Sequence, residues 1–231
     1  MVIDIKFKLN DSLFLRDPQD TDLGKRILQY SILLINELGF ESFTFKKLAN
    51  RIDSVEKSIY RYFDNKHKLL LFLTSWYWEW VHHLIKENIK NIEDPATKLK
   101  MAIENIVHAT SDSTSNAYIN EALLHQLIIN EGAKAYHTCH VDNENKLGLF
   151  FSYKNLVHTV VELIQDVNPR FRYSTSLASN LFEMANNQIY FASHMPRLTD
   201  IDEHEGNQED LIEMLTFFAF TLLEAKSDCK A

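Results

Sequence analysis

The stretch Phe43–Leu70 constrains the fold more than any other part of the chain, because it has the pattern of two short helices joined by a tight turn. Thr44 can cap the first helix, since its hydroxyl can accept a backbone N–H at the helix start. Leu48, Ala49 and Ile52 then fall on one face, and the small side chain of Ala49 lets a crossing helix approach closely. The stretch runs on into the start of a longer helix. We therefore expect a helix-turn-helix unit.

The second helix of this unit, predicted for residues 54–63, has a buried side and a polar side. Val55, Ile59 and Phe63 recur every four residues and are predicted to face inward. Asp53 has the spacing of a capping box relative to the glutamate three residues later. The outer side carries five polar side chains: Glu56, Lys57, Ser58, Tyr60 and Arg61. A short helix with a packed back and a cationic, hydrogen-bonding front suits the major groove of DNA.

The residue pattern of this stretch also resembles that of a known family. The similarity rests on Thr44, Leu48-Ala49, Tyr60-Arg61-Tyr62-Phe63, Asn65-Lys66 and Leu69-Leu70. Over roughly residues 22–70 it resembles the DNA-binding domain of TetR-type transcriptional regulators. The sequence departs from the family at the turn and at the opening of the recognition helix, where Asp53 replaces the usual glycine and Val55 a small or polar residue.

Residue chemistry divides the expected DNA contacts into two groups. Five side chains are expected to contact base edges, or phosphates in some poses: Lys46, Glu56, Lys57, Ser58 and Arg61. By residue type and by similarity to the family, four side chains are expected to contact and position phosphates: Thr44, Tyr60, Tyr62 and Lys66. For Tyr62, which borders the buried face, plain packing is an equally good interpretation.

The charge distribution favours contact with DNA through this part of the chain. The whole chain has a net charge of −8, but residues 22–68 contain nine cationic and six anionic residues. That segment therefore carries +3 and the remainder −11, as expected where a single small domain touches phosphate.

Composition and periodicity favour an all-α protein. The chain has 231 residues, 45% of them hydrophobic, and its five glycines and four prolines lie between periodic segments. Nine helices are expected, over residues 22–38, 44–51, 54–63, 65–89, 95–110, 118–130, 145–166, 174–194 and 209–225. We divide the chain into an N-terminal extension (1–20), a DNA-binding domain (21–66) and a helical regulatory and dimerisation domain (67–231).

The alternation of apolar and polar residues on both sides of Asn10-Asp11 predicts a short β-hairpin in the N-terminal extension. Its apolar face is expected to cover the helical body, although Lys6 and Lys8 also suit an arm that reaches toward a DNA groove. Two cysteines, no signal-peptide pattern and no apolar run long enough to span a bilayer indicate a soluble cytoplasmic protein without a membrane partner.

The last two long helices are predicted to form a homodimer interface. On the first, the apolar stripe includes Leu177, Leu181, Met184 and Gln188; on the second, it includes Leu211, Leu215, Phe218 and Leu222. The alternative is that both stripes serve only the core of one chain. The resemblance implies the interface, with two copies binding a pseudo-palindromic operator in double-stranded DNA.

A small-molecule effector is implied by the resemblance, and aromatic residues along the chain suit an apolar or planar ligand. The candidate pocket residues are Phe72, Trp76, Trp80, His83, His125, Phe151 and His158. Core packing is the competing interpretation for each of them. His137, Cys139, His140 and Asp142 lack the second ligand pair typical of zinc sites, so neither metal nor cofactor is expected. No catalytic motif stands out. The function predicted is a transcriptional regulator, acting as a repressor that the effector releases; the alternative is a helical ligand- or metal-binding protein that has lost DNA function.

Overall fold

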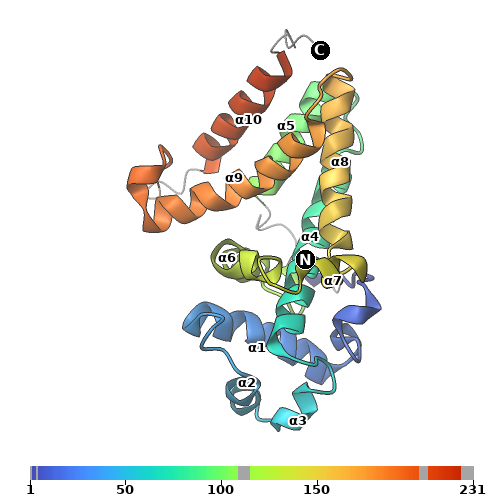
Figure 1. The fold of residues 1–231 in the computed structure, drawn as a ribbon, viewed down its shortest axis with the longest axis vertical. Helices are drawn as coiled ribbons and strands as arrows, with labels where there is room; N and C mark the ends of the chain where they lie inside the picture. Colours follow the sequence, from blue (N-terminus) through green and yellow to red (C-terminus); the bar gives the residue numbers. More distant parts are fainter. Residues whose placement is uncertain (1, 4, 109–114, 203–207, 225–231) are drawn as a thin grey trace. The chain divides into compact units, whose positions relative to one another are not determined.

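The computed structural model describes residues 2–3, 5–108, 115–202 and 208–224, and it confirms the all-α class (Figure 1). The chain divides into two compact units, which are described separately. Unit 1 comprises Met1–Glu79 and Thr110–Tyr153, and unit 2 comprises Trp80–Ala109 and Lys154–Ala231. These units reflect packing alone, so they do not test the functional division that we expect at residue 66.

Unit 1 contains the helix-turn-helix. Its helices are α1 (Asp22–Leu38), α2 (Phe45–Arg51), α3 (Glu56–Ile59), the first part of α4 (Lys66–Ile89), α6 (Glu121–Glu131) and α7 (Val141–Lys146). Three short 3-10 turns accompany them: η1 (Asp11–Leu13), η2 (Pro18–Asp20) and η3 (Gly132–Ala135). A two-stranded parallel sheet joins β1 (Val2–Ile3) to β2 (Ser115–Asn116).

Capping residues set both ends of α1 and the start of α2, and the cap at Thr44 was predicted. The Thr21 hydroxyl accepts a hydrogen bond from the Gly24 N–H at 3.0 Å, and Gly39 ends α1 with a φ of 76°. The Thr44 hydroxyl accepts from the Lys47 N–H at 3.2 Å and so starts α2. Asp53, in the turn after α2, has a φ of 50°, a left-handed conformation that aspartate tolerates better than most residues.

Helix α3 is shorter than predicted and begins differently. It covers only four residues, and its N-cap is Val55, with no side-chain hydrogen bond to the helix start. The predicted capping box is therefore wrong, because Asp53 lies in the turn itself. The prediction that Val55 faces inward is also wrong, since its side chain is 65% exposed, whereas Ile59 and Phe63 are fully buried as expected.

Aromatic rings from α4 and the N-terminal segment form much of the core of unit 1. Phe72 makes edge contacts with Phe63 and Phe14, with ring centroids 5.6 and 6.0 Å apart. One turn further along α4, Trp76 makes an edge contact with Phe7 at 5.2 Å. Such edge-to-face pairs stabilise the core beyond the burial of their area.

The predicted N-terminal β-hairpin is wrong. Val2–Ile3 instead pairs in parallel with Ser115–Asn116, and Asp11–Leu13 forms a 3-10 turn capped by the Asn10 side chain. We call residues 5–20 the N-terminal strap. Lys6 contacts the carboxylates of Asp17 and Asp20, so its charge is used within the strap and does not extend as an arm.

The strap covers the helical body, as the sequence indicated. Its backbone forms hydrogen bonds with the rest of the chain: the Leu15 N–H donates to the Tyr62 carbonyl at 2.8 Å, and the Lys68 ammonium donates to the Ser12 carbonyl at 2.9 Å. Its end packs directly on α1, where a Cβ added to Gly24 would lie 2.2 Å from the carbonyl oxygen of Pro18. Only a glycine allows this approach.

Helix α6 is attached to α1 and to the loop that follows α1. The Asn36 amide donates to the Leu123 carbonyl at 2.8 Å, and the Glu131 carboxylate accepts from the Phe40 N–H at 2.9 Å. Lys134 forms an ion pair with Glu131 at 2.7 Å and extends toward Glu41 at 3.4 Å. These contacts place α6 against α1 and the loop that leads into α2.

The helix predicted over residues 145–166 is two helices. Helix α7 ends at Lys146, Gly148 has a φ of 74°, and α8 (Phe151–Val167) begins after this reversal. The His67 ring nitrogen and the Glu144 carboxylate, 2.9 Å apart, join α7 to the first turn of α4. A glycine in left-handed conformation interrupts an otherwise continuous apolar periodicity.

Unit 2 is built from the end of α4, α5 (Pro95–Val107), most of α8, α9 (Ser174–His194), a 3-10 turn η4 (Pro196–Leu198) and α10 (Gln208–Glu224). Helix α5 packs against both α9 and α10. The His82 ring accepts or donates a hydrogen bond at 2.8 Å with the Thr159 hydroxyl, and burial lowers the pKa of His82 to about 4. None of the described helices is long and apolar enough to cross a membrane.

Candidate nucleic-acid interface

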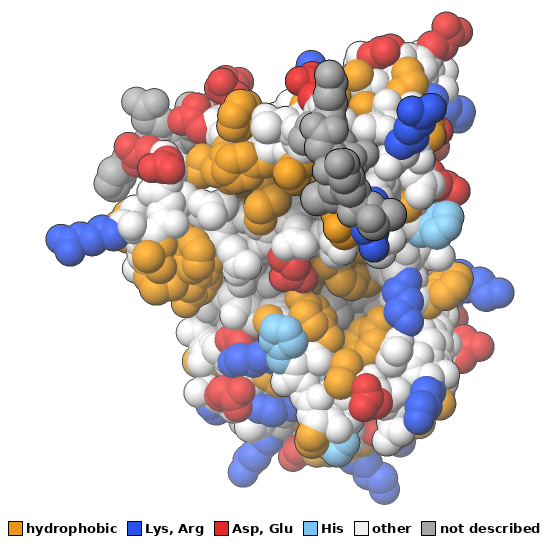
Figure 2. Space-filling view, turned by 45° about the horizontal axis from the view of Figure 1, so that its top comes forward, with side chains coloured by type: hydrophobic (Ala, Val, Ile, Leu, Met, Phe, Trp, Pro, Cys, Tyr) orange, Lys and Arg blue, Asp and Glu red, His pale blue; other side chains and the backbone are white. Residues whose placement is uncertain are grey.

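Four of the predicted DNA-contact side chains lie exposed on or beside α2 and α3. Lys46 projects from α2, Lys57 from α3, and Tyr60 and Arg61 from the turn that ends α3. Figure 2 shows Lys and Arg side chains (blue) projecting at its lower edge. The Tyr60 ring makes an edge contact with Phe45, with centroids 5.1 Å apart, and the side chain remains exposed.

Three further predicted residues, one exposed and two half-buried, also lie on α2 and α3 or beside them. Thr44 is exposed, although its hydroxyl already caps α2. Glu56 and Ser58 are half-buried on α3. In this position the Glu56 carboxylate suits a cytosine amino group, which is the donor that acidic side chains bind in the major groove.

Tyr62 and Lys66 do not fit the phosphate-contact roles predicted for them. Tyr62 is 3% exposed, and its hydroxyl hydrogen-bonds with the Thr21 hydroxyl at 2.7 Å. The Lys66 ammonium donates to the carbonyls of the loop between α1 and α2, at 2.9 Å to Phe40, 3.0 Å to Glu41 and 3.3 Å to Phe43. Both side chains are engaged in holding the unit together.

Other cations of the helix-turn-helix are also engaged within the chain. Arg51 forms an ion pair with Glu37 at 3.2 Å, Lys47 donates to the Ser42 carbonyl at 2.7 Å, and Arg26 donates to the Ile52 carbonyl. Within the described part of the chain, Lys46, Lys57 and Arg61 have no ion-pair or hydrogen-bond partner for their charged groups. Three free cations on one exposed surface are what a phosphate backbone requires.

Sequence reasoning missed Val55 as a member of this surface. Its periodicity with Ile59 and Phe63 predicted burial, yet the side chain stands among the exposed residues of α3. The available signal was its position, because the related regulators usually open the recognition helix with a small or polar residue.

The predicted dimer residues separate into two groups. Leu177, Leu181, Leu211 and Leu215 are buried within unit 2, so those four serve the packing of α9 and α10 and cannot face a partner. Met184 and Gln188 are half-exposed, and Gln188 accepts a hydrogen bond from the Thr199 hydroxyl at 2.5 Å. Phe218 and Leu222 are exposed on α10.

Of the predicted pocket residues, three lie on the surface. His83 is exposed on α4, Phe151 is 62% exposed at the start of α8, and the His158 side chain is exposed beside Glu162, with which its ring nitrogen makes a 3.5 Å contact. These side chains cannot enclose a ligand within the chain. Their exposure does not support the predicted enclosed pocket, because apolar or aromatic character does not by itself indicate the direction of a side chain.

The other four pocket residues are buried by neighbouring side chains. In unit 1, Phe72 and Trp76 pack on the strap, and His125 stacks on Tyr77 with ring centroids 5.5 Å apart. In unit 2, Trp80 is buried on α4. Their observed contacts are those of core packing.

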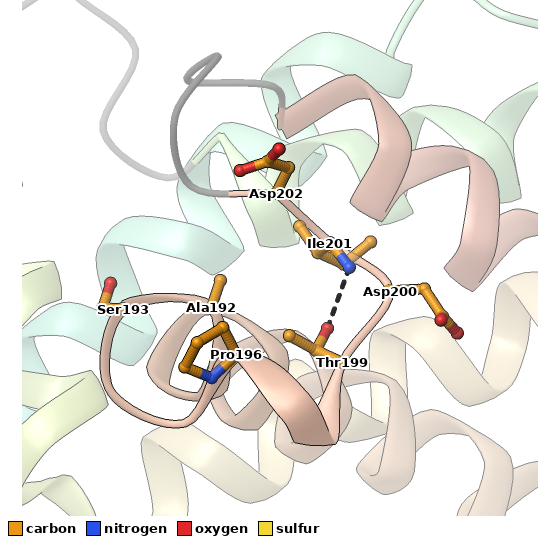
Figure 3. Close-up of a pocket in the computed structure, with 7 residues that line it drawn as sticks. All are labelled: Ala192, Ser193, Pro196, Thr199, Asp200, Ile201 and Asp202. Carbon is orange, nitrogen blue, oxygen red and sulfur yellow. Dashed lines mark hydrogen bonds between the residues drawn. The ribbon is translucent and has the colours of Figure 1, made fainter.

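The structure has a hollow at the end of α9, of about 390 Å³. Figure 3 shows that it is lined by Ala192, Ser193, Pro196 and residues 199–202, and that the Ile201 N–H donates to the Thr199 hydroxyl at 3.1 Å. None of the predicted pocket residues lines it. Among the described residues, no group of three or more His, Cys, Asp or Glu side chains is placed to hold a metal ion.

Comparisons with known proteins agree with this geometry. The family model "Bacterial regulatory proteins, tetR family" matches residues 27–72, which contain α2 and α3. No curated protein sequence matches the chain.

Solved structures extend the similarity beyond that segment. AibR in complex with isovaleryl coenzyme A and operator DNA is 14% identical, with a TM-score of 0.57 over 83% of this chain and 98% of that one. The fatty acid degradation regulator FadR from Bacillus halodurans is 15% identical, with a TM-score of 0.59 over 87% and 98%. PfmR, a TetR family transcriptional regulator from Thermus thermophilus, is 15% identical, with a TM-score of 0.56 over 87% and 98%. The chain thus carries the N-terminal helix-turn-helix of the tetR family of bacterial regulatory proteins and has the fold of TetR-family regulators.

Proposed function

We propose that the protein is a transcriptional regulator that binds double-stranded operator DNA through α2 and α3. The observation that carries the proposal is the set of three exposed, unpartnered cations within the described chain, Lys46, Lys57 and Arg61, on a helix-turn-helix whose back is buried. Thr44, Glu56, Ser58 and Tyr60 supply hydrogen-bonding groups beside them. Cations position the backbone, and α3 places its side chains toward base edges.

We further propose that the protein acts as a homodimer on a pseudo-palindromic operator, because one short recognition helix offers few contacts. The partner face would be the exposed side of α10. Met214, Phe218 and Leu222 are spaced four residues apart and form one stripe, with the exposed Phe217 beside it. Hydrophobic side chains (orange) gather in the upper part of Figure 2, where α9 and α10 lie. Exposed apolar patches of this kind are typical of protein–protein contacts.

Repression and release by a small-molecule effector complete the proposal. AibR, whose structure holds both isovaleryl coenzyme A and operator DNA, supports the idea that one such fold can combine the two kinds of ligand. We propose that α4 transmits the release, because this single helix contributes residues to both units. The alternative is that the protein is a helical ligand- or metal-binding protein that has lost DNA binding. That function would not account for the exposed cations of α2 and α3.

The double variant Lys57→Ala, Arg61→Ala is expected to lower operator affinity by about 10- to 100-fold, because each of the two substitutions removes one contact to a base or a phosphate. Binding would be measured by fluorescence anisotropy with the DNA upstream of the protein's own gene and with scrambled DNA, at two salt concentrations. The variant should also show a shallower dependence on salt.

The matched control is Lys90→Ala, Arg197→Ala, which removes the same charge from exposed positions in unit 2. It should bind like the wild type. If both double variants lose affinity equally, net charge and not the α3 surface determines binding. If the wild type binds neither that upstream DNA nor any duplex selected from a random pool, even at low salt, the regulator function is wrong and the ligand-binding rival is favoured.

The variant Phe218→Glu is expected to convert the dimer to a monomer at micromolar concentration, because a carboxylate would be buried in the apolar face of α10. Sedimentation velocity gives the oligomeric state, and the operator affinity should fall with it. Phe151→Glu places the same charge at a more exposed aromatic on α8 and should remain dimeric. A dimeric Phe218→Glu protein would place the subunit contact elsewhere.

A further inference from the structure

Val55 is an anomaly on the surface proposed to meet DNA. At 65% exposure it is the most exposed of the large hydrophobic side chains in the described chain. Its neighbours are polar: Ser54 and Glu56 are half-buried and Lys57 is exposed. Single exposed hydrophobic residues are common, so this exposure becomes informative only together with the position of the residue.

That position is one where a valine works against local stability. Val55 is the N-cap of α3, and no side chain there accepts a hydrogen bond from the helix start. Serine, threonine, aspartate or asparagine would satisfy one of the free N–H groups, which a valine cannot do. The residue therefore contributes neither to the cap nor to the core, where Ile59 and Phe63 are buried.

The DNA-facing surface offers Val55 one apolar partner. The first residues of a recognition helix are those that reach base edges in the major groove. Among the groups presented there, only the 5-methyl of thymine is apolar, and small apolar side chains contact it. The unpartnered cations Lys57 and Arg61 on the same side, within the described chain, would hold the backbone on which such a base lies.

We propose that Val55 is a specificity-determining residue that selects thymine by packing its isopropyl group on the 5-methyl. The proposal rests on the proposed function, since it needs α3 in the major groove. It extends that function by naming one base that the operator must contain in each half-site, at the position facing the start of α3.

The test uses the full-length protein and an operator duplex selected from a random pool. Each thymine is replaced in turn by deoxyuridine, which lacks only the methyl group. At one thymine per half-site, the wild type should lose about fourfold in affinity, the value expected for one buried methyl. The variant Val55→Ser should be insensitive at that position while keeping its sensitivity to other base changes.

Stability separates this effect from misfolding. Val55→Ser introduces a hydroxyl that can cap α3, so its melting temperature should equal or exceed that of the wild type. The control Leu198→Ser removes another exposed apolar side chain, far along the sequence in η4, and should keep the wild-type deoxyuridine profile.

The possible failures are distinguishable. If no selected duplex binds the wild type, the proposed function fails and the inference with it. If the wild type binds but shows no thymine whose methyl matters, or if Val55→Ser keeps the same methyl sensitivity, Val55 does not read thymine and the inference alone is overturned.

Discussion

Replacing Lys66 by methionine is expected to lower the free energy of unfolding by about 3 kcal/mol, because hydrogen bonds from a charged donor to three carbonyls are lost. The methionine keeps most of the apolar stem but leaves the carbonyls of Phe40, Glu41 and Phe43 without their donor. It also removes the ammonium from the face of the Phe40 ring, 4.7 Å from the centroid. Urea unfolding followed by tryptophan fluorescence gives the change.

Lys47→Met is the matched control, since Lys47 donates to a single carbonyl of the same loop, that of Ser42, from an exposed position. Its effect should stay below about 1 kcal/mol. If Lys66→Met loses DNA affinity while its unfolding curve matches the wild type, the ammonium serves phosphate contact after all, and the loop does not depend on it.

Replacing Gly24 by alanine is expected to destabilise the protein by about 2–3 kcal/mol, although alanine is normally the better helix former. The new Cβ would lie 2.2 Å from the Pro18 carbonyl oxygen and 2.5 Å from its Cα, both backbone atoms. The strap must therefore move off α1 or α1 must bend. A melting curve by circular dichroism measures the loss.

Gly132→Ala provides the comparison, because its Cβ would meet only the flexible side chain of Ile128, at 3.2 Å. Its stability should stay within about 1 kcal/mol of the wild type. A Gly24→Ala protein that melts at or above the wild-type temperature would mean that the strap yields without loss, and that its contact with α1 contributes little.

Local signals in the sequence were sufficient for the elements that depend on them. The start of α2 was predicted from Thr44, because capping is chemistry between neighbours in the chain. The bounds of α1 match the predicted range 22–38, and Thr21 and Gly39 cap it there. The extent of α9 matches the predicted range 174–194, which periodicity indicated. The exposed cations Lys46, Lys57 and Arg61 followed from the polar face of the helix-turn-helix.

The errors arose where distant residues decide the outcome. Residue type marks Lys66 as a phosphate ligand, but only the fold brings three loop carbonyls to its ammonium. The aromatic residues of α4 suggested a cavity, but Phe7 and Phe14, from the N-terminal strap, pack against Trp76 and Phe72. Asp53 is left-handed, α3 begins only at Glu56 and Val55 is exposed, which periodicity alone cannot predict.

The parallel pairing of Val2–Ile3 with Ser115–Asn116 also has a consequence for biosynthesis. The Asn10 amide, likewise, donates to the carbonyl of Leu147, a residue 137 positions later. At translation rates of about 5–20 residues per second, the segment that contains Val2–Ile3 and Asn10 is synthesised on the order of ten seconds before these partners. During that interval its apolar side chains are open to chaperones and proteases.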